Sequence, residues 1–210
     1  IKLYPKCLNF ILIPCAKIFF RILSDKGLIM LKCHFESKSE FRKSCLSKLK
    51  FSAQFTKLKK NSEICKKLEN IIRTYGVKNV LLYLPLKFEV DVRPLVSKLR
   101  RESRCRVFVP FMKNESFVPV PFRFPLETKK FNLKEPSFSS LQPRIELAIV
   151  PVVGIDGDKR RIGFGKGMYD RYFEKLRHKP IIVFTQLELC KTTQLLGENH
   201  DIKADIVITY

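Results

Sequence analysis

A short glycine-rich segment, Arg161–Asp170, places the strongest limits on what this chain folds into. It holds three of the chain's eight glycines, at alternate positions, together with Arg161 and Lys166. Glycines spaced in this way let the backbone approach a ligand closely and turn successive N–H groups toward an anion. A helix that starts directly afterwards adds its positive N-terminal end. The segment therefore predicts an anion-binding loop between a strand and a helix.

The spacing of this loop differs from the two common nucleotide-binding patterns. No G-x-x-x-x-G-K-[ST] motif is present, and Met168 stands where the dinucleotide fingerprint needs its last glycine. Tyr169 adds a hydroxyl, and Asp170 adds a hard oxygen ligand of the kind that Mg²⁺ prefers. An ordinary glycine-rich turn is the alternative, but it leaves the two cations and the carboxylate unexplained. Taken alone, the loop predicts that a phosphate group binds here and does not identify a reaction.

Strand-like and helix-like segments alternate along most of the chain. Segments with the apolar spacing of a helix are 37–49, which opens with the capping box Ser37–Glu40, and 62–73, 92–101 and 168–177. Segments with the composition of a strand are 80–84, 106–110, 117–124, 147–153, 181–185 and 206–209. This order predicts an α/β fold: a single Rossmann-like domain with a mostly parallel sheet flanked by helices. Ligands of such sheets bind beyond the carboxyl ends of the strands, where the glycine loop lies.

The composition fits one globular domain with a strongly basic surface. The chain has 210 residues, 45% of them hydrophobic, and a formal net charge of +21. Such a charge suits nucleic acid, an acidic membrane surface or a phosphorylated small molecule. The lysines are scattered, however, and no block of six like charges occurs. We therefore expect mostly solvated charges, a few of them used for a phosphorylated ligand, and no nucleic-acid partner.

The cysteines indicate a reduced compartment. There are seven of them, an odd number, and no two form a C-x-x-C pair. That pattern argues against a zinc site and against a disulfide framework. We expect buried thiols that act as small apolar side chains in a cytoplasmic protein.

The first 29 residues stand apart from the rest. The chain opens with Ile1, and its first methionine is Met30. The longest uncharged run between them, Cys7–Ala16, is too short to span a bilayer, and no convincing signal-peptide cleavage pattern follows it. We expect residues 1–29 to be a non-native or disordered leader from an over-extended gene prediction, and residues 30–210 to form the domain.

Several motifs in a fixed order resemble those of a known family. The turn Asp156-Gly157, followed by R-[IL]-G-x-G-x-G-x-Y-D, resembles the signature of the 5-formyltetrahydrofolate cyclo-ligases, also called methenyltetrahydrofolate synthetases. Shorter segments that are similar to other motifs of that family are Lys38–Arg42, Glu89–Asp91, Glu135-Pro136, Gln186, His200-Asp201, Asp205 and Thr209. The resemblance covers roughly Lys38 to Thr209.

The resemblance implies an enzyme that uses ATP and Mg²⁺ to close 5-formyltetrahydrofolate, with or without a polyglutamate tail, to 5,10-methenyltetrahydrofolate through a phosphorylated formyl group. The catalytic residues that it implies are Arg161, Lys166 and Tyr169. The ATP-binding residues are Lys38, Ser39, Glu40, Phe41, Arg42, Arg161, Ile162, Gly163, Phe164, Gly165, Lys166, Gly167, Met168 and Tyr169. Folate-binding residues are Leu84, Glu89, Phe164, Lys166 and Met168, and the metal ligands are Asp170 and Asp201.

The chain also departs from the family pattern. Met168 replaces the first of two tyrosines that usually precede the aspartate of the loop, and Val152 replaces a usual glycine. Three alternatives therefore stay open: a basic nucleic-acid-binding protein on the same fold, an enzyme acting on a phosphorylated metabolite without ATP, and an inactive relative disabled by Met168. Our expectation is a cytoplasmic monomer that acts on a small molecule and has no membrane partner.

Overall fold

Six strands form the central sheet in the computed structural model, which describes residues 34–128 and 134–210. Their order across the sheet is β10 (Ile206–Ile208), β9 (Ile181–Thr185), β6 (Leu147–Pro151), β1 (Asn79–Leu81), β2 (Arg106–Lys113) and β3 (Ser116–Pro121). All neighbours pair in parallel except β2 and β3. The predicted α/β fold with a mostly parallel sheet is confirmed, and β3 lies at an edge, as its prolines predicted.

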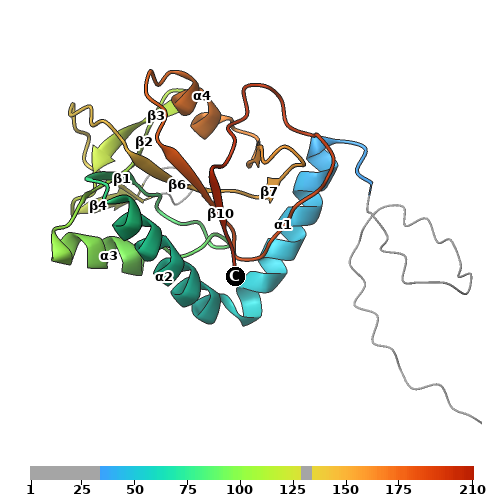
Figure 1. Ribbon diagram of the computed structural model, residues 1–210, viewed down its shortest axis with the longest axis horizontal. Coiled ribbons are helices and arrows are strands. Elements are labelled where there is room, and N and C mark those ends of the chain that lie inside the picture. Colours follow the sequence, from blue (N-terminus) through green and yellow to red (C-terminus); the bar gives the residue numbers. More distant parts are fainter. Residues whose placement is uncertain (1–33, 129–133) are drawn as a thin grey trace, which may run out of the picture. The chain divides into compact units, whose positions relative to one another are not determined.

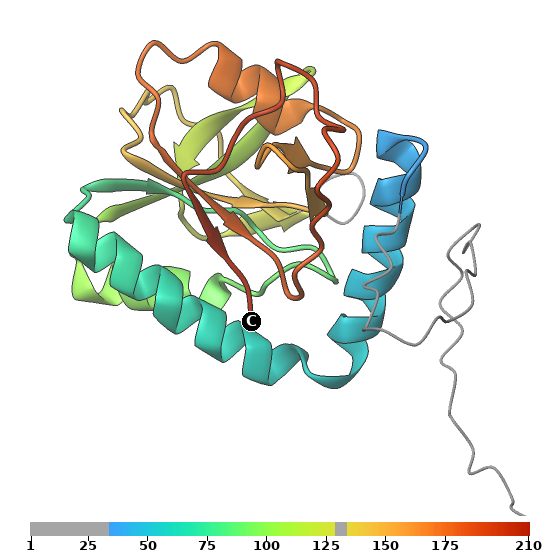
Figure 2. The same ribbon diagram turned by 45° about the vertical axis from the view of Figure 1, so that its right-hand side comes forward.

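Helices cover both faces of this sheet (Figures 1 and 2). One face packs against α1 (Lys38–Phe55), α2 (Lys57–Tyr75) and α3 (Arg93–Glu102), and the other packs against α4 (Met168–Glu174). Neighbouring residues of a strand serve opposite faces because side chains alternate across it. Thus Ile149 belongs to the cluster under the first three helices, whereas Ala148 and Val150 belong to the cluster under α4.

The first helix begins where its sequence predicted. The Ser37 hydroxyl accepts a hydrogen bond from the Glu40 N–H at 3.1 Å, which satisfies one of the free donors of the first turn. The Glu40 carboxylate accepts from the N–H of Glu36 at 2.8 Å and not from Ser37, so the predicted capping box is only half formed. Phe41 and Cys45 lie on the buried face of α1.

Two small hairpins were not predicted. One joins β4 (Leu126–Thr128) to β5 (Lys134–Pro136), and the other joins β7 (Gly154–Ile155) to β8 (Arg161–Ile162). The second hairpin lies between β6 and the glycine loop. Its turn is fixed by the buried Asp156 carboxylate, which accepts hydrogen bonds from the N–H groups of Asp158, Arg160 and Gly197.

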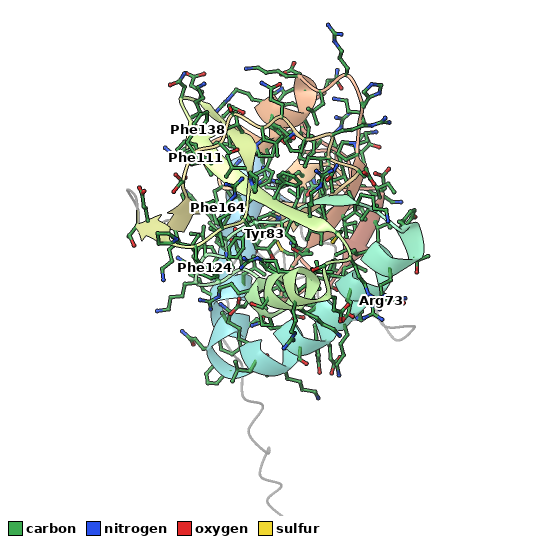
Figure 3. The ribbon with its side chains drawn as sticks, turned by 90° about the vertical axis from the view of Figure 1, so that its left-hand side faces the viewer. Arg73, Tyr83, Phe111, Phe124, Phe138 and Phe164 are labelled. Carbon is green, nitrogen blue, oxygen red and sulfur yellow. A yellow bond between two sulfur atoms is a disulfide. The ribbon has the colours of Figure 1, made fainter. Side chains whose placement is uncertain are left out.

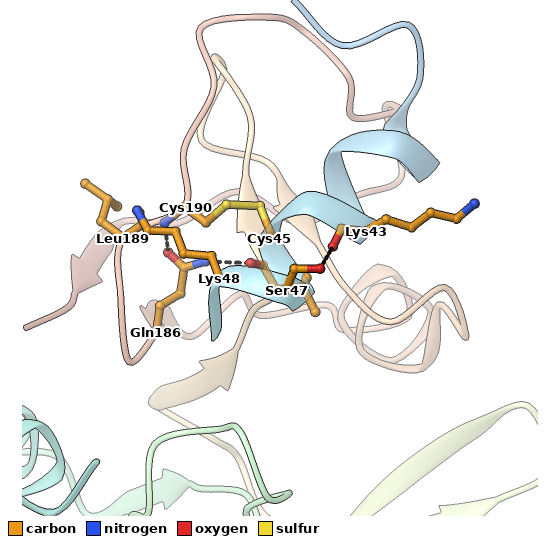
Figure 4. Close-up of a disulfide and its surroundings, with 8 residues drawn as sticks. Lys43, Cys45, Ser47, Lys48, Gln186, Leu189 and Cys190 are labelled. Atoms are coloured by element: carbon orange, nitrogen blue, oxygen red, sulfur yellow. Dashed lines mark hydrogen bonds between the residues drawn. A yellow bond between two sulfur atoms is a disulfide. The ribbon is translucent and has the colours of Figure 1, made fainter. Parts of the chain in front are cut away.

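A disulfide corrects the prediction made from the cysteines. Cys45 on α1 is bonded to Cys190 in the segment after β9, 145 residues later (Figure 4). The odd count and the missing C-x-x-C motif excluded a regular framework, but they carry no information on a single pair brought together by the fold. The Lys48 ammonium reinforces the same junction by donating to the Leu189 carbonyl at 2.7 Å. Cys65 and Cys105 are free thiols in the described part of the chain.

The direction of the connections sets where a ligand binds. From β1 the chain crosses through α3 to β2 on one side, and from β6 it crosses through α4 to β9 on the other. The crevice beyond the carboxyl ends of β1 and β6 is therefore the switch point of the sheet, where open α/β folds bind ligands.

Two further findings concern the N-terminal segment and membranes. The compact unit begins at Phe35, and the expected leader 1–29 lies outside the described residues. No helix among residues 34–128 and 134–210 combines the length and the apolar character needed to cross a membrane.

Candidate functional site

A cavity of about 210 Å³ opens at this switch point. Figure 3 labels Tyr83 and Phe164, two aromatic residues of its lining. The full lining comes from the segment after β1, the end of β2, β5, the end of β6 and the glycine loop: Tyr83, Leu84, Leu86, Glu89, Pro110, Met112, Lys134, Glu135, Pro151, Arg161, Phe164, Lys166, Gly167, Met168 and Tyr169. A larger groove of about 780 Å³, between the β2–β3 turn and α4, contains none of the residues predicted for the site.

Arg161 is the buried cation of the site, with only 5% of its surface exposed. Its guanidinium donates to the Pro151 carbonyl at 3.3 Å and to the Asp170 carboxylate at 3.2 Å, and it lies 4.9 Å from the centre of the Tyr169 ring. A Cβ at Gly163 would lie 2.3 Å from Nη1 of Arg161. Gly163 is therefore required because the guanidinium passes directly over its backbone.

Helix α1 meets the glycine loop across 121 residues of sequence. Nε of Arg42 donates to the Gly163 carbonyl at 2.7 Å, and the guanidinium carbon lies 3.8 Å from where a Cβ of Gly165 would be. Gly165 has a φ of 95°, which side chains rarely adopt. The exposed Lys166 follows it. The structure therefore brings Arg42, Arg161 and Lys166 to one loop whose backbone is free to face an anion.

The two predicted metal ligands lie on adjoining segments. Oδ1 of Asp170 accepts from the Ile202 N–H at 3.3 Å, which ties the start of α4 to the residue that follows Asp201. Oδ2 of Asp201 accepts from the Lys38 ammonium and from the Glu198 N–H at 2.7 Å. Both carboxylates are buried, and each is held by a cation.

This arrangement has a consequence for a bound cation. Within the described ranges, no three His, Cys, Asp or Glu side chains gather into a group that would hold a metal. Two hard oxygen ligands suit Mg²⁺, which usually takes few protein ligands and completes its shell with phosphate oxygens and water. Asp170 and Asp201 therefore fit an ion that arrives with a phosphorylated ligand and do not form an all-protein cage.

Other residues predicted for ATP have structural surroundings. Phe41 is buried in the core, with ring atoms 2.7 Å from where a Cβ of Gly154 would stand. Ile162 is also fully buried, the Glu40 carboxylate is bonded to the N–H of Glu36, and Ser39 is exposed on the first turn of α1. Their contact with ATP stays a prediction.

The cavity side of the site is apolar apart from a few groups. Oε2 of Glu89 accepts from the Leu86 N–H at 2.7 Å, and burial raises the pKa of this carboxyl to about 7, opposed by that hydrogen bond and by the charge of Arg161. The Tyr83 hydroxyl donates to the Val90 carbonyl at 2.9 Å. Burial also raises the pKa of the Tyr169 hydroxyl above its ordinary value, so this group stays protonated at neutral pH.

Sequence reasoning gave no site role to seven residues of the cavity wall, among them Tyr83, Met112 and Glu135. Tyr83 lies in the predicted strand 80–84 and Met112 lies just after the predicted strand 106–110, so their position at strand ends was the only available signal. Glu135 was noted within a Glu-Pro pair and was given no role. Its burial, at 4% exposure, is a property of the β4–β5 hairpin that no periodicity predicts.

Comparison with known proteins places this geometry in a family. A family model described as the 5-formyltetrahydrofolate cyclo-ligase family matches residues 34–210. The 5-formyltetrahydrofolate cyclo-ligase of Mycoplasma pneumoniae is 27% identical over 173 residues, which cover 81% of this chain and 97% of that protein. The enzyme of that name from Haemophilus influenzae is 27% identical over 139 residues, covering 62% of this chain and 74% of its own length.

Solved structures give the same result. The 5,10-methenyltetrahydrofolate synthetase of Mycoplasma pneumoniae superposes with a TM-score of 0.64 at 25% identity, covering 81% of this chain and 97% of that one. The 5,10-methenyltetrahydrofolate synthetase of Aquifex aeolicus superposes with a TM-score of 0.65 at 25% identity, covering 82% of this chain and 89% of that one.

Proposed function

Since the chain belongs to the 5-formyltetrahydrofolate cyclo-ligase family, and is thus an enzyme of the ligase class, we propose that it converts 5-formyltetrahydrofolate to 5,10-methenyltetrahydrofolate at the expense of ATP. The formyl oxygen attacks the γ-phosphorus and ADP leaves. N10 then attacks the phosphorylated formyl carbon, loses its proton, and the C–O bond breaks to release phosphate. Phosphorylation turns a poor leaving oxygen into a good one.

One observation carries this proposal: residues of the anion-binding loop also line the apolar cavity. Arg161, Lys166 and Tyr169 belong to the glycine loop and the start of α4, and all three line the cavity. A phosphate on the loop and a ring in the cavity would therefore lie side by side. Phosphoryl transfer needs this juxtaposition, because its catalysis rests on positioning and on neutralising charge.

The residues of the loop divide this work. Arg161 is fixed by Pro151 and Asp170 before any ligand binds, so its charge costs no reorganisation when negative charge develops on the transferred phosphoryl group. Lys166 is exposed and adds a mobile charge to the same phosphate. The protonated Tyr169 hydroxyl donates to the formyl or phosphoryl oxygen. Lys38 and Arg42, from the first turns of α1, bind the remaining phosphates of ATP.

Asp170 and Asp201 are the residues that would hold Mg²⁺. The ion would neutralise phosphate charge when ATP binds. In this proposal the carboxylates take their positions from Arg161 and Lys38, so both keep their orientation in the free protein. We further propose that the enzyme is a cytoplasmic monomer that accepts folates with or without a polyglutamate tail.

The test is ATP-dependent growth of the methenyl absorbance when purified protein is mixed with 5-formyltetrahydrofolate. We expect one ADP and one phosphate for each product molecule. Lys166→Ala should weaken ATP binding by about 1–3 kcal/mol, the size of a charge-assisted hydrogen bond, and exposed Glu174→Gln is the matched control. Turnover of a phosphorylated metabolite without nucleotide, or salt-dependent RNA binding that ATP does not affect, would overturn the proposal.

A further inference from the structure

Glu135 is a buried acid that the proposed reaction does not yet use. It is the middle residue of β5, only 4% of its surface is exposed, and it lines the cavity beyond β1 and β6. A buried carboxylate is rare unless hydrogen bonds or a cation compensate for its lost hydration. The group that compensates for the lost hydration of Glu135 is therefore informative about function.

The protein satisfies only part of this carboxylate. Oε1 accepts one hydrogen bond, from the Met112 N–H at 3.1 Å. Among residues 34–128 and 134–210, no Lys, Arg or His side chain forms an ion pair with Glu135. A carboxylate offers about four acceptor positions in general, so Glu135 keeps most of its capacity unused.

The unused oxygen is not fully enclosed by protein, and its residue lines the cavity. Across the described residues, Asn79 Oδ1 is the one fully buried side-chain oxygen or nitrogen without a hydrogen-bond partner. Among the described residues, Oε2 of Glu135 has no hydrogen-bond partner either, yet it is not one of these fully buried atoms. Part of its surface is therefore accessible, and the accessible space next to Glu135 is the cavity. Leu84, Pro110 and Met112 line the same space, so a donor that reaches Oε2 there meets little competition from water.

Two carboxylates thus line the cavity from different elements. Glu89 lies in the segment after β1, and the charge of Arg161 acts to lower its pKa. Glu135 accepts a hydrogen bond from Met112 on β2. In the sheet, β1 lies between β2 and β6, and β6 ends at Pro151. A flat ring that presents its formyl group to Arg161 would place its other edges in the same cavity, which Glu135 also lines.

Building on the proposed function, we propose that Glu135 binds the N–H edge of the substrate's pterin ring. That edge carries an exocyclic amino group beside a ring N–H, two donors that point the same way. A carboxylate accepts such a pair with both oxygens, as it accepts a guanidinium. Glu135 is thereby the residue that selects a 2-amino-4-oxo ring, and the Met112 N–H holds it in position.

The test compares Glu135→Gln with wild type on two ligands. Gln keeps an oxygen for the Met112 N–H but turns an amino group toward the ring donors. We expect the KM for 5-formyltetrahydrofolate to rise roughly 10- to 100-fold, the cost of leaving buried donors unpaired, with the KM for ATP unchanged and the melting temperature no lower than that of wild type. Exposed Glu174→Gln is the matched control and should match wild type in every reading.

The second ligand is an analogue that lacks the exocyclic amino group. Wild type should bind it roughly 10- to 100-fold more weakly than the parent folate, and Glu135→Gln should show little of this discrimination. Equal discrimination by both proteins, or an unchanged KM in Glu135→Gln, overturns the proposal. Binding is also measured by calorimetry without ATP, so a wild type that binds folate and fails to turn it over counts against the proposed function alone.

Discussion

The phosphate side and the cavity side of the site treat their carboxylates in opposite ways. On the phosphate side, Asp170 and Asp201 are buried against Arg161 and Lys38. On the cavity side, Glu89 and Glu135 each accept one backbone hydrogen bond, and within the described ranges neither forms an ion pair. The first pair already has cationic partners in the free protein, whereas the second pair keeps acceptor positions that a ligand can fill.

This difference predicts opposite responses to mutation. Removing a partner from a paired buried charge strands the other charge, which is strongly destabilising. Neutralising an unpaired buried charge removes a desolvation cost and stabilises the fold, while it removes an acceptor that the ligand needs. The predictions below test this contrast, beginning with the largest expected effect.

The disulfide should affect the phosphate side alone. It fixes α1, which carries Lys38 and Arg42, to the segment after β9, and it closes a loop of 145 residues. In the chain-entropy account such a link contributes about 5 kcal/mol to stability. Replacing Cys45 and Cys190 together by Ala should lower the free energy of unfolding by up to that amount and raise the KM for ATP. The KM for folate should stay within twofold of wild type; an equal rise in both would show that α1 supports the whole site.

Arg161→Met should cost about 3–5 kcal/mol of stability, because it leaves the Asp170 carboxylate buried without its cation. Adding Asp170→Asn to this variant should restore a large part of the loss, since no charge is then stranded. Urea denaturation of the two single variants and the double variant measures the coupling. Additive losses would mean that the ion pair does not hold the loop and would remove the basis of the contrast.

The sequence predicted much of the fold because its strand signals are strong. The segment 181–185 was predicted at its observed bounds, and Pro119 and Pro121 placed β3 at an edge, since proline cannot donate to a neighbouring strand. The hairpin β7–β8 was missed because its strands have two residues each, too few to show a period. Its turn depends on hydrogen bonds that the Asp156 carboxylate accepts, and the one from the Gly197 N–H is a tertiary contact.

The site was predicted unevenly for a related reason. The glycine loop is a local motif, so its residues and their order were visible in the chain. Glu135 and the Cys45–Cys190 bond are products of tertiary packing, because each depends on which segments the sheet brings together. Likewise, the motif at the start of α1 could not separate Arg42, which contacts the glycine loop, from Phe41, which packs in the core.

Glu89→Gln should stabilise the protein at high pH. The pKa of Glu89 is about 7 in the folded protein against an ordinary value of 4.5, so the folded state holds a proton that the unfolded state releases between these values. Wild-type stability should therefore fall as pH rises from 4.5 to 7, and Gln removes this dependence. At pH 8 the variant should be more stable by roughly 1–3 kcal/mol, and the difference should vanish below pH 4.5. Denaturation of both proteins at pH 5 and pH 8 measures this difference in the free energy of unfolding. Equal stability of wild type and variant at pH 8 would show that Glu89 is not an unpaired buried charge.

Met168→Tyr should have the smallest effect, because Met168 lies where the two sides of the site meet. It begins α4, lines the cavity, and packs against the apolar cluster below the helix. A tyrosine there adds a ring face and a hydroxyl, so kcat or the KM for folate should change by roughly tenfold or less, the size of one hydrogen bond. Tyr169→Phe should cost more, since it removes a hydroxyl from the loop side of the cavity, and the Tyr83 hydroxyl is already bound to the Val90 carbonyl. Steady-state kinetics separate the two variants.

If wild type is inactive and Met168→Tyr restores turnover, Met168 has disabled the site and the chain is an inactive relative. If both proteins turn over at similar rates, catalysis rests on Arg161, Lys166, Tyr169 and the backbone of the loop, and Met168 serves only as cavity wall.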